Sequence, residues 1–229
     1  RSIADTALST MPYTCGPFSW RQEDNLLWMH YGKGEIFWEM PSGWLIDKTH
    51  PILFEIAENI FEHGMNFSAD NLQNSARKPG EKHSLLYSAG IDSHAAMLLS
   101  PPETAIIYID SMNDSELERQ GPKKQISSMQ NATIIPTNMW ESATELLGGR
   151  PRAINGHCVF IPIILLADFL GLGSIALGSV LGTTYLGHFG DHYNGDYISR
   201  PWVQNRMEFF RKAGLELSYP VGGLSEIIT

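Results

Sequence analysis

Cysteine is scarce in this chain, and long apolar runs are absent. Only Cys15 and Cys158 occur among its 229 residues, too few for a disulfide framework or a structural zinc site. We therefore expect a reducing, cytoplasmic setting. No stretch is long enough to span a membrane, and residues 1–5 lack the apolar segment of a signal peptide. Neither a secreted disulfide-rich protein nor a membrane protein is expected.

Positive charge is also in short supply. The chain has 16 Lys and Arg residues against 25 Asp and Glu residues, which gives a net charge of -9. A broad nucleic-acid surface needs clustered Lys and Arg to displace counterions, so a tRNA partner is disfavoured. The apolar fraction of 43% is sufficient for a core. The length predicts one large domain, or one domain with a small appendage.

Two common phosphate-binding motifs are missing. No Gly-x-x-x-x-Gly-Lys-Ser/Thr sequence occurs, which argues against a Walker-type NTPase. Residues 171–176, Gly-Leu-Gly-Ser-Ile-Ala, fit the dinucleotide-binding fingerprint by spacing. That fingerprint must follow a strand and open a helix, whereas here it ends a helical pattern and opens a strand pattern. We interpret this segment as a helix stop.

The most informative stretch is residues 84–99. It combines an apolar strand pattern, a turn of small residues and an amphipathic helix pattern. The turn offers backbone N–H groups, the Ser88 and Ser93 hydroxyls and the positive end of a helix dipole, all suited to an anion. Asp92 alone is explained by the preference for an acidic residue in a first helical turn. Its combination with two serines after an apolar strand favours a nucleotide-phosphate loop.

The six residues Ser88-Ala89-Gly90-Ile91-Asp92-Ser93 closely resemble the Ser-Gly-Gly-x-Asp-Ser signature of the PP-loop ATP pyrophosphatases, members of the adenine nucleotide alpha hydrolase superfamily. The resemblance implies ATP as a ligand and Mg²⁺ as its metal. It implies that Ser88, Gly90 and Ser93 cradle pyrophosphate and that Asp92 acts with Mg²⁺ near the leaving group. The implied nucleotide-binding residues of this loop are Tyr87, Ser88, Ala89, Gly90, Ile91, Asp92 and Ser93. Ala89 departs from the usual glycine and resists positive φ.

Two later segments extend the resemblance, which covers residues 83–220. Residues 155–160, the helical pattern after them and a strand pattern ending at Gly178 and Ser179 look like the second block of PP-loop enzymes such as the 7-cyano-7-deazaguanine synthases. Residues 190–196 resemble the Gly-Asp loop of the NAD- and GMP-synthetase branch, which implies Asp191 as a metal ligand. The family pattern also implies that Asp110 and Ser111 face the adenosine and that Gly178 and Ser179 allow close approach.

The region before the loop, residues 1–80, is predicted to be a small α+β appendage. Aromatic-rich runs at 26–31 and 35–40 flank a glycine turn and predict a β-hairpin. Residues 51–63 have a helical apolar pattern ending at Gly64. Residues 1–20 are expected to be an irregular arm, residues 66–82 a polar linker, and the tryptophans packing residues.

Residues 81–229 are predicted to form the ATP-binding domain. Apolar strand patterns at 104–110, 133–137, 174–179 and 216–219 alternate with helical patterns at 116–129, 140–147, 157–170 and 201–213. This alternation predicts an α/β fold with a parallel sheet and helices on both faces. Ligands bind at the carboxyl ends of such strands, where the Ser88 loop, residues 110–112 and residues 178–183 fall.

The resemblance implies an enzyme that adenylates a carboxylate or amide oxygen of a small nucleobase-like substrate or metabolite. Pyrophosphate leaves, and a nitrogen nucleophile then displaces AMP. One alternative is a sulfurtransferase in which Cys158 is the catalytic nucleophile, although the apolar residues after Cys158 favour a buried thiol. The other is a non-catalytic nucleotide-binding module, with Ala89 marking lost chemistry. The aromatic appendage has more apolar surface than it can bury alone, so we expect it to pack on the nucleotide domain or on another chain, as in a homodimer.

Overall fold

The computed structural model describes residues 13–15, 17–63, 69–111, 116–146, 158–178 and 201–222. Within these residues, the strands are β1 (Tyr13–Cys15), β2 (Phe18–Glu23), β3 (Leu26–Tyr31), β4 (Gly34–Glu39), β5 (Lys82–Leu86), β6 (Ala105–Ser111), β7 (Ala132–Thr137), β8 (Leu172–Leu177) and β9 (Glu216–Ser218). The helices are α1 (Pro51–His63), α2 (Ile91–Leu98), α3 (Glu116–Ile126), α4 (Met139–Leu146), α6 (Phe160–Leu165), α7 (Ala167–Leu170) and α9 (Pro201–Lys212), with short 3-10 turns η1 (Ile46–Lys48) and η2 (Ala69–Asn71).

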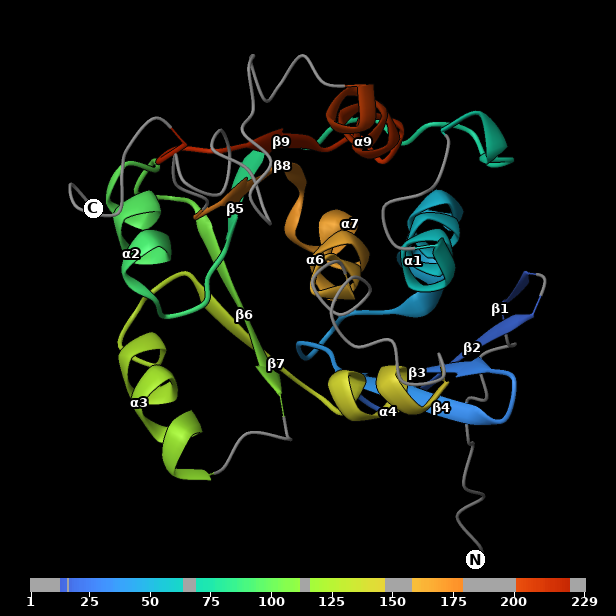
Figure 1. Ribbon diagram of the computed structural model, residues 1–229, viewed down its shortest axis with the longest axis horizontal. Coiled ribbons are helices and arrows are strands. Elements are labelled where there is room, and N and C mark those ends of the chain that lie inside the picture. The colour runs from blue at the N-terminus through green and yellow to red at the C-terminus, as the bar shows by residue number, and fades with distance from the viewer. Residues whose placement is uncertain are drawn as a thin grey trace, which may run out of the picture.

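The described strands pair into one nine-stranded mixed sheet in the order β1-β2-β3-β4-β7-β6-β5-β8-β9 (Figure 1). Neighbours from β1 to β7 along this order are antiparallel, and neighbours from β7 to β9 are parallel. The expected α/β class with parallel strands after residue 81 is confirmed. The sheet as a whole is mixed because β4 joins it at β7 through Trp38 and Thr137.

The parallel half of the sheet has a doubly wound strand order. If β5 is numbered 1, the order β7-β6-β5-β8-β9 reads 3-2-1-4-5. The chain therefore moves outward from β5 through β6 to β7 and then returns to the other side of β5 to form β8. The gap between the carboxyl ends of β5 and β8 is the point where the direction of winding reverses, and in such sheets this point is the usual ligand crevice.

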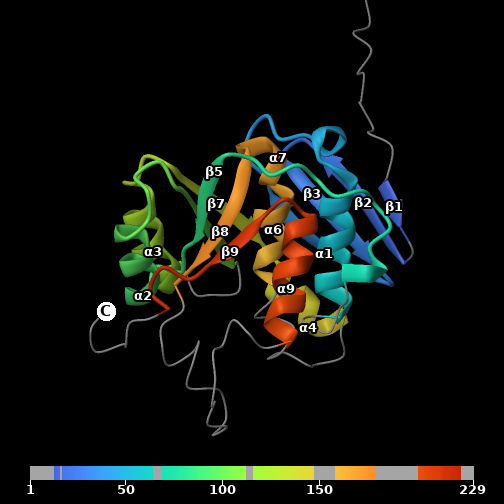
Figure 2. The same ribbon diagram turned by 90° about the horizontal axis from the view of Figure 1, so that it is seen from above.

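Alternate residues of β6 belong to two different apolar clusters, as a strand buried on both sides requires. Ile106 and Tyr108 belong to a cluster that includes Ala96 of α2 and Ile126 of α3. Ile107 belongs to a larger cluster that contains the buried residues of α1 and α6. Figure 2 shows α2 and α3 on one side of the parallel strands and α6 and α9 on the other.

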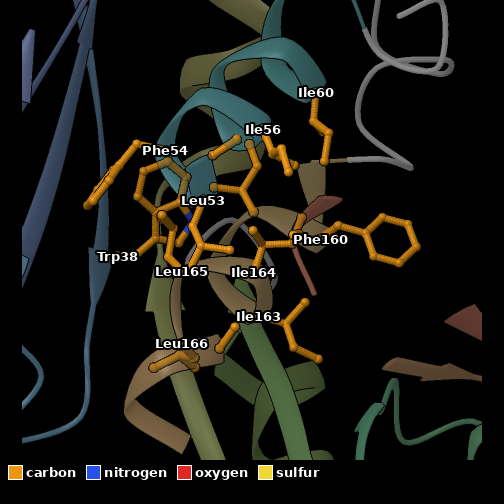
Figure 3. Packing of buried hydrophobic residues seen from close by; sticks show 14 of the residues in the cluster. Trp38, Leu53, Phe54, Ile56, Ile60, Phe160, Ile163, Ile164, Leu165 and Leu166 are labelled. Carbon is orange, nitrogen blue, oxygen red and sulfur yellow. The ribbon is translucent and has the colours of Figure 1, made fainter. Parts of the chain in front are cut away.

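The larger cluster joins the N-terminal and C-terminal parts of the chain. Figure 3 shows Leu53, Phe54 and Ile56 of α1 facing the apolar residues of α6, with Trp38 of β4 beside them. Trp38 and Trp44 are buried, which confirms the expected packing role for these two tryptophans. The predicted appendage thus shares a sheet and a core with the parallel strands, and the predicted domain boundary at residue 80 falls in the extended segment before β5.

Most predicted elements are present, with changed ends. The hairpin appears as β3 and β4, α1 has the predicted bounds, and the predicted helix at 157–170 is divided into α6 and α7. Gly171 ends α7 with a φ of 68° immediately before β8, which confirms the helix stop. The irregular arm expected for residues 1–20 is wrong for residues 13–15, which form β1, and for residues 18–20, which begin β2 and bury Phe18 and Trp20.

The prediction of a polar linker over residues 66–82 is also wrong at Arg77. This side chain is buried, and its Nε donates to Oδ1 of Asp168 at 2.6 Å. Its terminal nitrogens donate to backbone carbonyls at the start of β8, in α7 and after α9, at Leu172, Ala167, Ala213 and Gly214. Arg77, in a segment with the composition of a polar linker, therefore connects α7, β8 and the residues after α9.

Candidate functional site

The loop from Tyr87 to Gly90 connects β5 to α2 at the switch point. Ala89 has a φ of 61°, the left-handed conformation that favours glycine. Gly90 is the extended N-cap of α2, and no side chain caps the helix there. The first N–H groups of an α-helix have no partner within the helix, and no side chain caps those of α2, so this end of the helix is suited to an anion.

The two loop serines have different environments. Ser93 is buried, and its Oγ donates to the carbonyl oxygen of Gly90 at 2.9 Å. Ser88 is exposed, and its Oγ lies 3.2 Å from Oγ of Ser93 and 3.4 Å from the Gly90 nitrogen. Ser93 therefore fixes the turn, while Ser88 presents a hydroxyl to solvent beside the open end of α2.

Asp92 has a carboxylate oxygen without a partner. Its Oδ1 is buried and accepts no hydrogen bond within the described residues. A buried carboxylate oxygen usually has a hydrogen bond or a cation, so this one is suited to a metal or to a donor on a ligand. The described residues contain no group of three or more His, Cys, Asp and Glu side chains that could hold a metal. The single orphaned carboxylate oxygen of Asp92 is compatible with Mg²⁺, which is commonly held by one or two carboxylates together with substrate phosphates.

Gly178, directly after β8, lies against the first turn of α2. A Cβ atom at this position would lie 2.7 Å from both Cα and the backbone nitrogen of Ser93 and 2.9 Å from the carbonyl carbon of Asp92. Real Cβ atoms do not approach backbone this closely, so only glycine fits. Gly178 thus approaches the backbone of α2 closely, and its expected close approach to a nucleotide stays a prediction.

Tyr87, the residue before Ser88, has a buried hydroxyl that joins α2 to α3. Nε2 of Gln125 donates to the Tyr87 hydroxyl oxygen at 2.8 Å, and that oxygen lies 3.2 Å from Nδ1 of His94. Burial raises the pKa of Tyr87, an effect partly opposed by the hydrogen bond from Gln125. Tyr87 is therefore a neutral phenol that holds its proton.

Asp110, expected to face an adenosine, is fully buried at the end of β6. Its Oδ2 lies 2.6 Å from Nζ of Lys123 on α3, and the Lys123 side chain is 37% exposed. The carboxylate therefore fastens α3 to β6. Ser179 and Asp191 lie outside the described residues, as does the side chain of Ser111.

Cys158, the candidate nucleophile, lies away from the loop. It is buried in the larger cluster, whereas Tyr87 and Ala96 belong to the smaller one. Desolvation raises the pKa of the thiol to about 12. A buried thiol with a raised pKa is protonated at neutral pH, which disfavours Cys158 as a nucleophile.

The structure brings together Tyr87, the Ser88–Ser93 loop and Gly178, and adds three side chains that sequence reasoning missed. These are His94, Lys123 and Gln125, from α2 and α3. His94 lies one residue after the signature and its helical position is visible in the sequence. The contacts of Lys123 and Gln125 depend on how α3 lies over the sheet, which no local pattern specifies.

Comparison of the chain with protein-family models and with curated proteins returns no match. Within the described residues, no helix has both the length and the apolar character needed to cross a membrane.

Proposed function

We propose that the chain binds ATP at the loop between β5 and α2 and acts as an enzyme of the PP-loop ATP pyrophosphatase type. The observation that carries this proposal is the position of the signature-like loop. It lies where the winding of a doubly wound sheet reverses, and it opens a helix without a side-chain cap. The helices seen on the two sides of the parallel strands are compatible with the PP-loop fold.

In this proposal, the chain contributes mainly charge stabilisation and positioning. The open N–H groups of α2 and the exposed Ser88 hydroxyl hold the pyrophosphate portion of ATP as negative charge accumulates on it. Ser93 and Gly178 keep the turn and the helix start in place. The orphaned Oδ1 of Asp92 would hold Mg²⁺. Mg²⁺, when bound, neutralises charge on the phosphates.

The proposed reaction is adenylation of a small substrate. An oxygen of a carboxylate or amide attacks the α-phosphorus of ATP, and the bond to the bridging oxygen of pyrophosphate breaks. A nitrogen nucleophile then attacks the activated carbon and AMP leaves with the attacking oxygen. The burial and raised pKa of Cys158 favour nitrogen over sulfur as the nucleophile. Ala89 has a φ of 61°, the left-handed conformation that glycine usually adopts. Alanine in place of the usual glycine is therefore compatible with the shape of the loop.

The first test is calorimetric titration of the protein with ATP and MgCl₂. We expect micromolar-range binding that Asp92→Asn weakens and that Glu103→Gln, a change at an exposed turn residue, leaves unaltered. No ATP binding by a folded wild-type protein would overturn the proposal.

Turnover separates an enzyme from a non-catalytic module. The protein is incubated with MgATP and a small-molecule cell extract, and the phosphorus spectrum is recorded over time. Formation of AMP and pyrophosphate, lost in Asp92→Asn, is expected. Binding without AMP formation would favour the non-catalytic module, and turnover at the wild-type rate in Asp92→Asn would overturn the site assignment. Cytoplasmic location and a homodimer stay predictions. Sedimentation equilibrium would test the homodimer by measuring the mass of the protein in solution.

A further inference from the structure

The orientation of α2 decides where its open N–H groups point, yet little apolar packing holds this helix. Only Ser93 and Ala96 of its eight residues are buried. Ile91 and Leu98 are 65% and 72% exposed. Fixed geometry at an anion site needs rigid support, because a donor displaced by a fraction of an ångström binds less well.

Three side chains supply polar support on the side of α2 that faces α3. Nε2 of Gln125 donates to the Tyr87 oxygen at 2.8 Å, and the Tyr87 oxygen lies 3.2 Å from Nδ1 of His94 in the first turn of α2. Nε2 of Gln125 also lies 3.5 Å from Nδ1 of His94. Tyr87 is the first residue of the loop between β5 and α2, so the three contacts connect the loop, α2 and α3.

The direction of these hydrogen bonds follows from the groups that meet. An amide nitrogen can only donate, so the Tyr87 oxygen accepts from Gln125 and its own proton is left to donate. Nδ1 of His94 faces that hydroxyl and the same amide nitrogen, both of which can donate, so we assign Nδ1 as the acceptor and the His94 proton to Nε2. Tyr87 retains its proton because burial raises its pKa.

The part of α3 that carries Gln125 is held against the sheet by its neighbouring residues. Ile126, next to Gln125, is fully buried in the smaller cluster, and Lys123 pairs with the buried Asp110 at 2.6 Å. Gln125 therefore lies between two residues of α3, Lys123 and Ile126, that contact the sheet.

We propose that Tyr87, His94 and Gln125 are positioning residues that orient the first turn of α2 for the phosphates of a bound nucleotide. This inference rests on the proposed function. It predicts that removing one link weakens ATP binding even where the protein stays folded. It also predicts that removing a second link adds little, because the three side chains contact one another and act as one hydrogen-bonded unit.

The experiment compares MgATP dissociation constants, measured by calorimetry, for wild type, Tyr87→Phe, Gln125→Leu and the double variant. We expect each single variant to bind about tenfold more weakly, the scale of one lost hydrogen bond. The double variant should bind about as weakly as either single one. Ser127→Ala, in the turn directly after α3, is the matched control, since Ser127 is exposed and its hydroxyl donates to the Lys123 carbonyl of α3.

Melting temperatures of all variants separate positioning from simple stabilisation. A purely structural role would lower melting temperatures and leave the dissociation constant of the folded protein unchanged, which would overturn the inference while the proposed function stood. Additive losses in the double variant would also overturn it. A wild type that binds no ATP would overturn the proposed function and this inference with it.

A spectroscopic measurement on the free wild type needs no variant and no nucleotide. Nitrogen-15 shifts of the His94 ring at a pH where it is neutral should show the proton on Nε2. A proton on Nδ1 would overturn the hydrogen-bonded chain whatever the calorimetry gives. If Tyr87→Phe fails to fold, Gln125→Leu, at an exposed position, carries the binding test alone.

Discussion

Gly178 and Ser93 are in direct backbone contact, although they are 85 positions apart (178 − 93) in the sequence: a Cβ atom at Gly178 would lie 2.7 Å from Cα of Ser93. This contact sets the distance between β8 and the first turn of α2. The glycine that ends β8 is therefore required by the fold of the site, whatever ligand the site takes.

Replacing Gly178 with alanine should displace the first turn of α2. Backbone atoms cannot move aside as a flexible side chain can, so we expect a loss of about 1–3 kcal/mol in the free energy of unfolding. We also expect weaker MgATP binding. Urea unfolding and calorimetry measure the two effects. Gly121→Ala is the control, because a Cβ atom there meets nothing within 4 Å. A crystal structure of Gly178→Ala with Ser93 unmoved would contradict the prediction.

Ala89→Gly should stabilise the protein. Alanine at a φ of 61° is strained by about 1–2 kcal/mol relative to right-handed backbone. Glycine removes this strain but makes the unfolded chain more flexible, at a cost of about 0.5–1 kcal/mol. The net expectation is a gain of up to about 1 kcal/mol in urea unfolding. Ala95→Gly, inside α2, should instead lose about 1 kcal/mol. Opposite signs for the two changes are the signature of the left-handed position.

The sequence was sufficient for elements whose pattern is local. The period of apolar residues in α1 and the glycine turn between β3 and β4 determine those elements without reference to the rest of the chain. The loop from Ser88 to Ser93 is equally local, because strand, small residues and helix start follow one another directly. These parts could be predicted.

The parts that could not be predicted depend on distant partners. β2 alternates apolar and polar residues only from Phe18 to Arg21, a strand pattern too short to be decisive by itself. Its partners are distant, because it pairs with β3 and its Trp20 packs on Phe54 and donates to Glu58, which is 38 residues away. Arg77 lies in a polar stretch and finds its carboxylate 91 residues later. Asp110 was expected to face a ligand because it ends a strand, but Lys123 on α3 reaches it. Only the assembled fold specifies these pairs.

Arg77→Leu should cost about 3 kcal/mol of stability, because it removes the buried guanidinium that bonds to Asp168 and to four backbone carbonyls. The cost is at the lower end for a broken buried pair, since Asp168 is 28% exposed and keeps the bond from the His50 N–H. Arg77→Lys should recover little, since an ammonium group lacks the planar set of five donors. Arg211→Leu is the matched control. Arg211 pairs with Glu208 at an exposed position and should change stability by less than about 0.5 kcal/mol. Similar losses at Arg77 and Arg211 in urea unfolding would contradict the central role of Arg77.

Cys158 should make the protein less stable at alkaline pH. The thiol pKa is raised from 9.0 to about 12 in the folded protein because burial disfavours the thiolate. Above pH 9 the unfolded chain releases this proton and the folded chain keeps it. The stabilising contribution is therefore complete below pH 9 and is lost as pH rises towards 12, at about 1.4 kcal/mol per pH unit.

The measurement is the difference in free energy of unfolding between wild type and Cys158→Ala at pH 7.5 and at pH 10, in a Cys15→Ser background. Alanine does not titrate, so the difference isolates Cys158 from the tyrosines and lysines that titrate in both proteins. Wild type should lose stability relative to Cys158→Ala by about 1.4 kcal/mol per pH unit above pH 9, where the unfolded chain begins to ionise. An unchanged difference, or rapid alkylation of Cys158 by iodoacetamide at pH 7.5, would show an accessible thiol and would reopen sulfur transfer as the chemistry of the site.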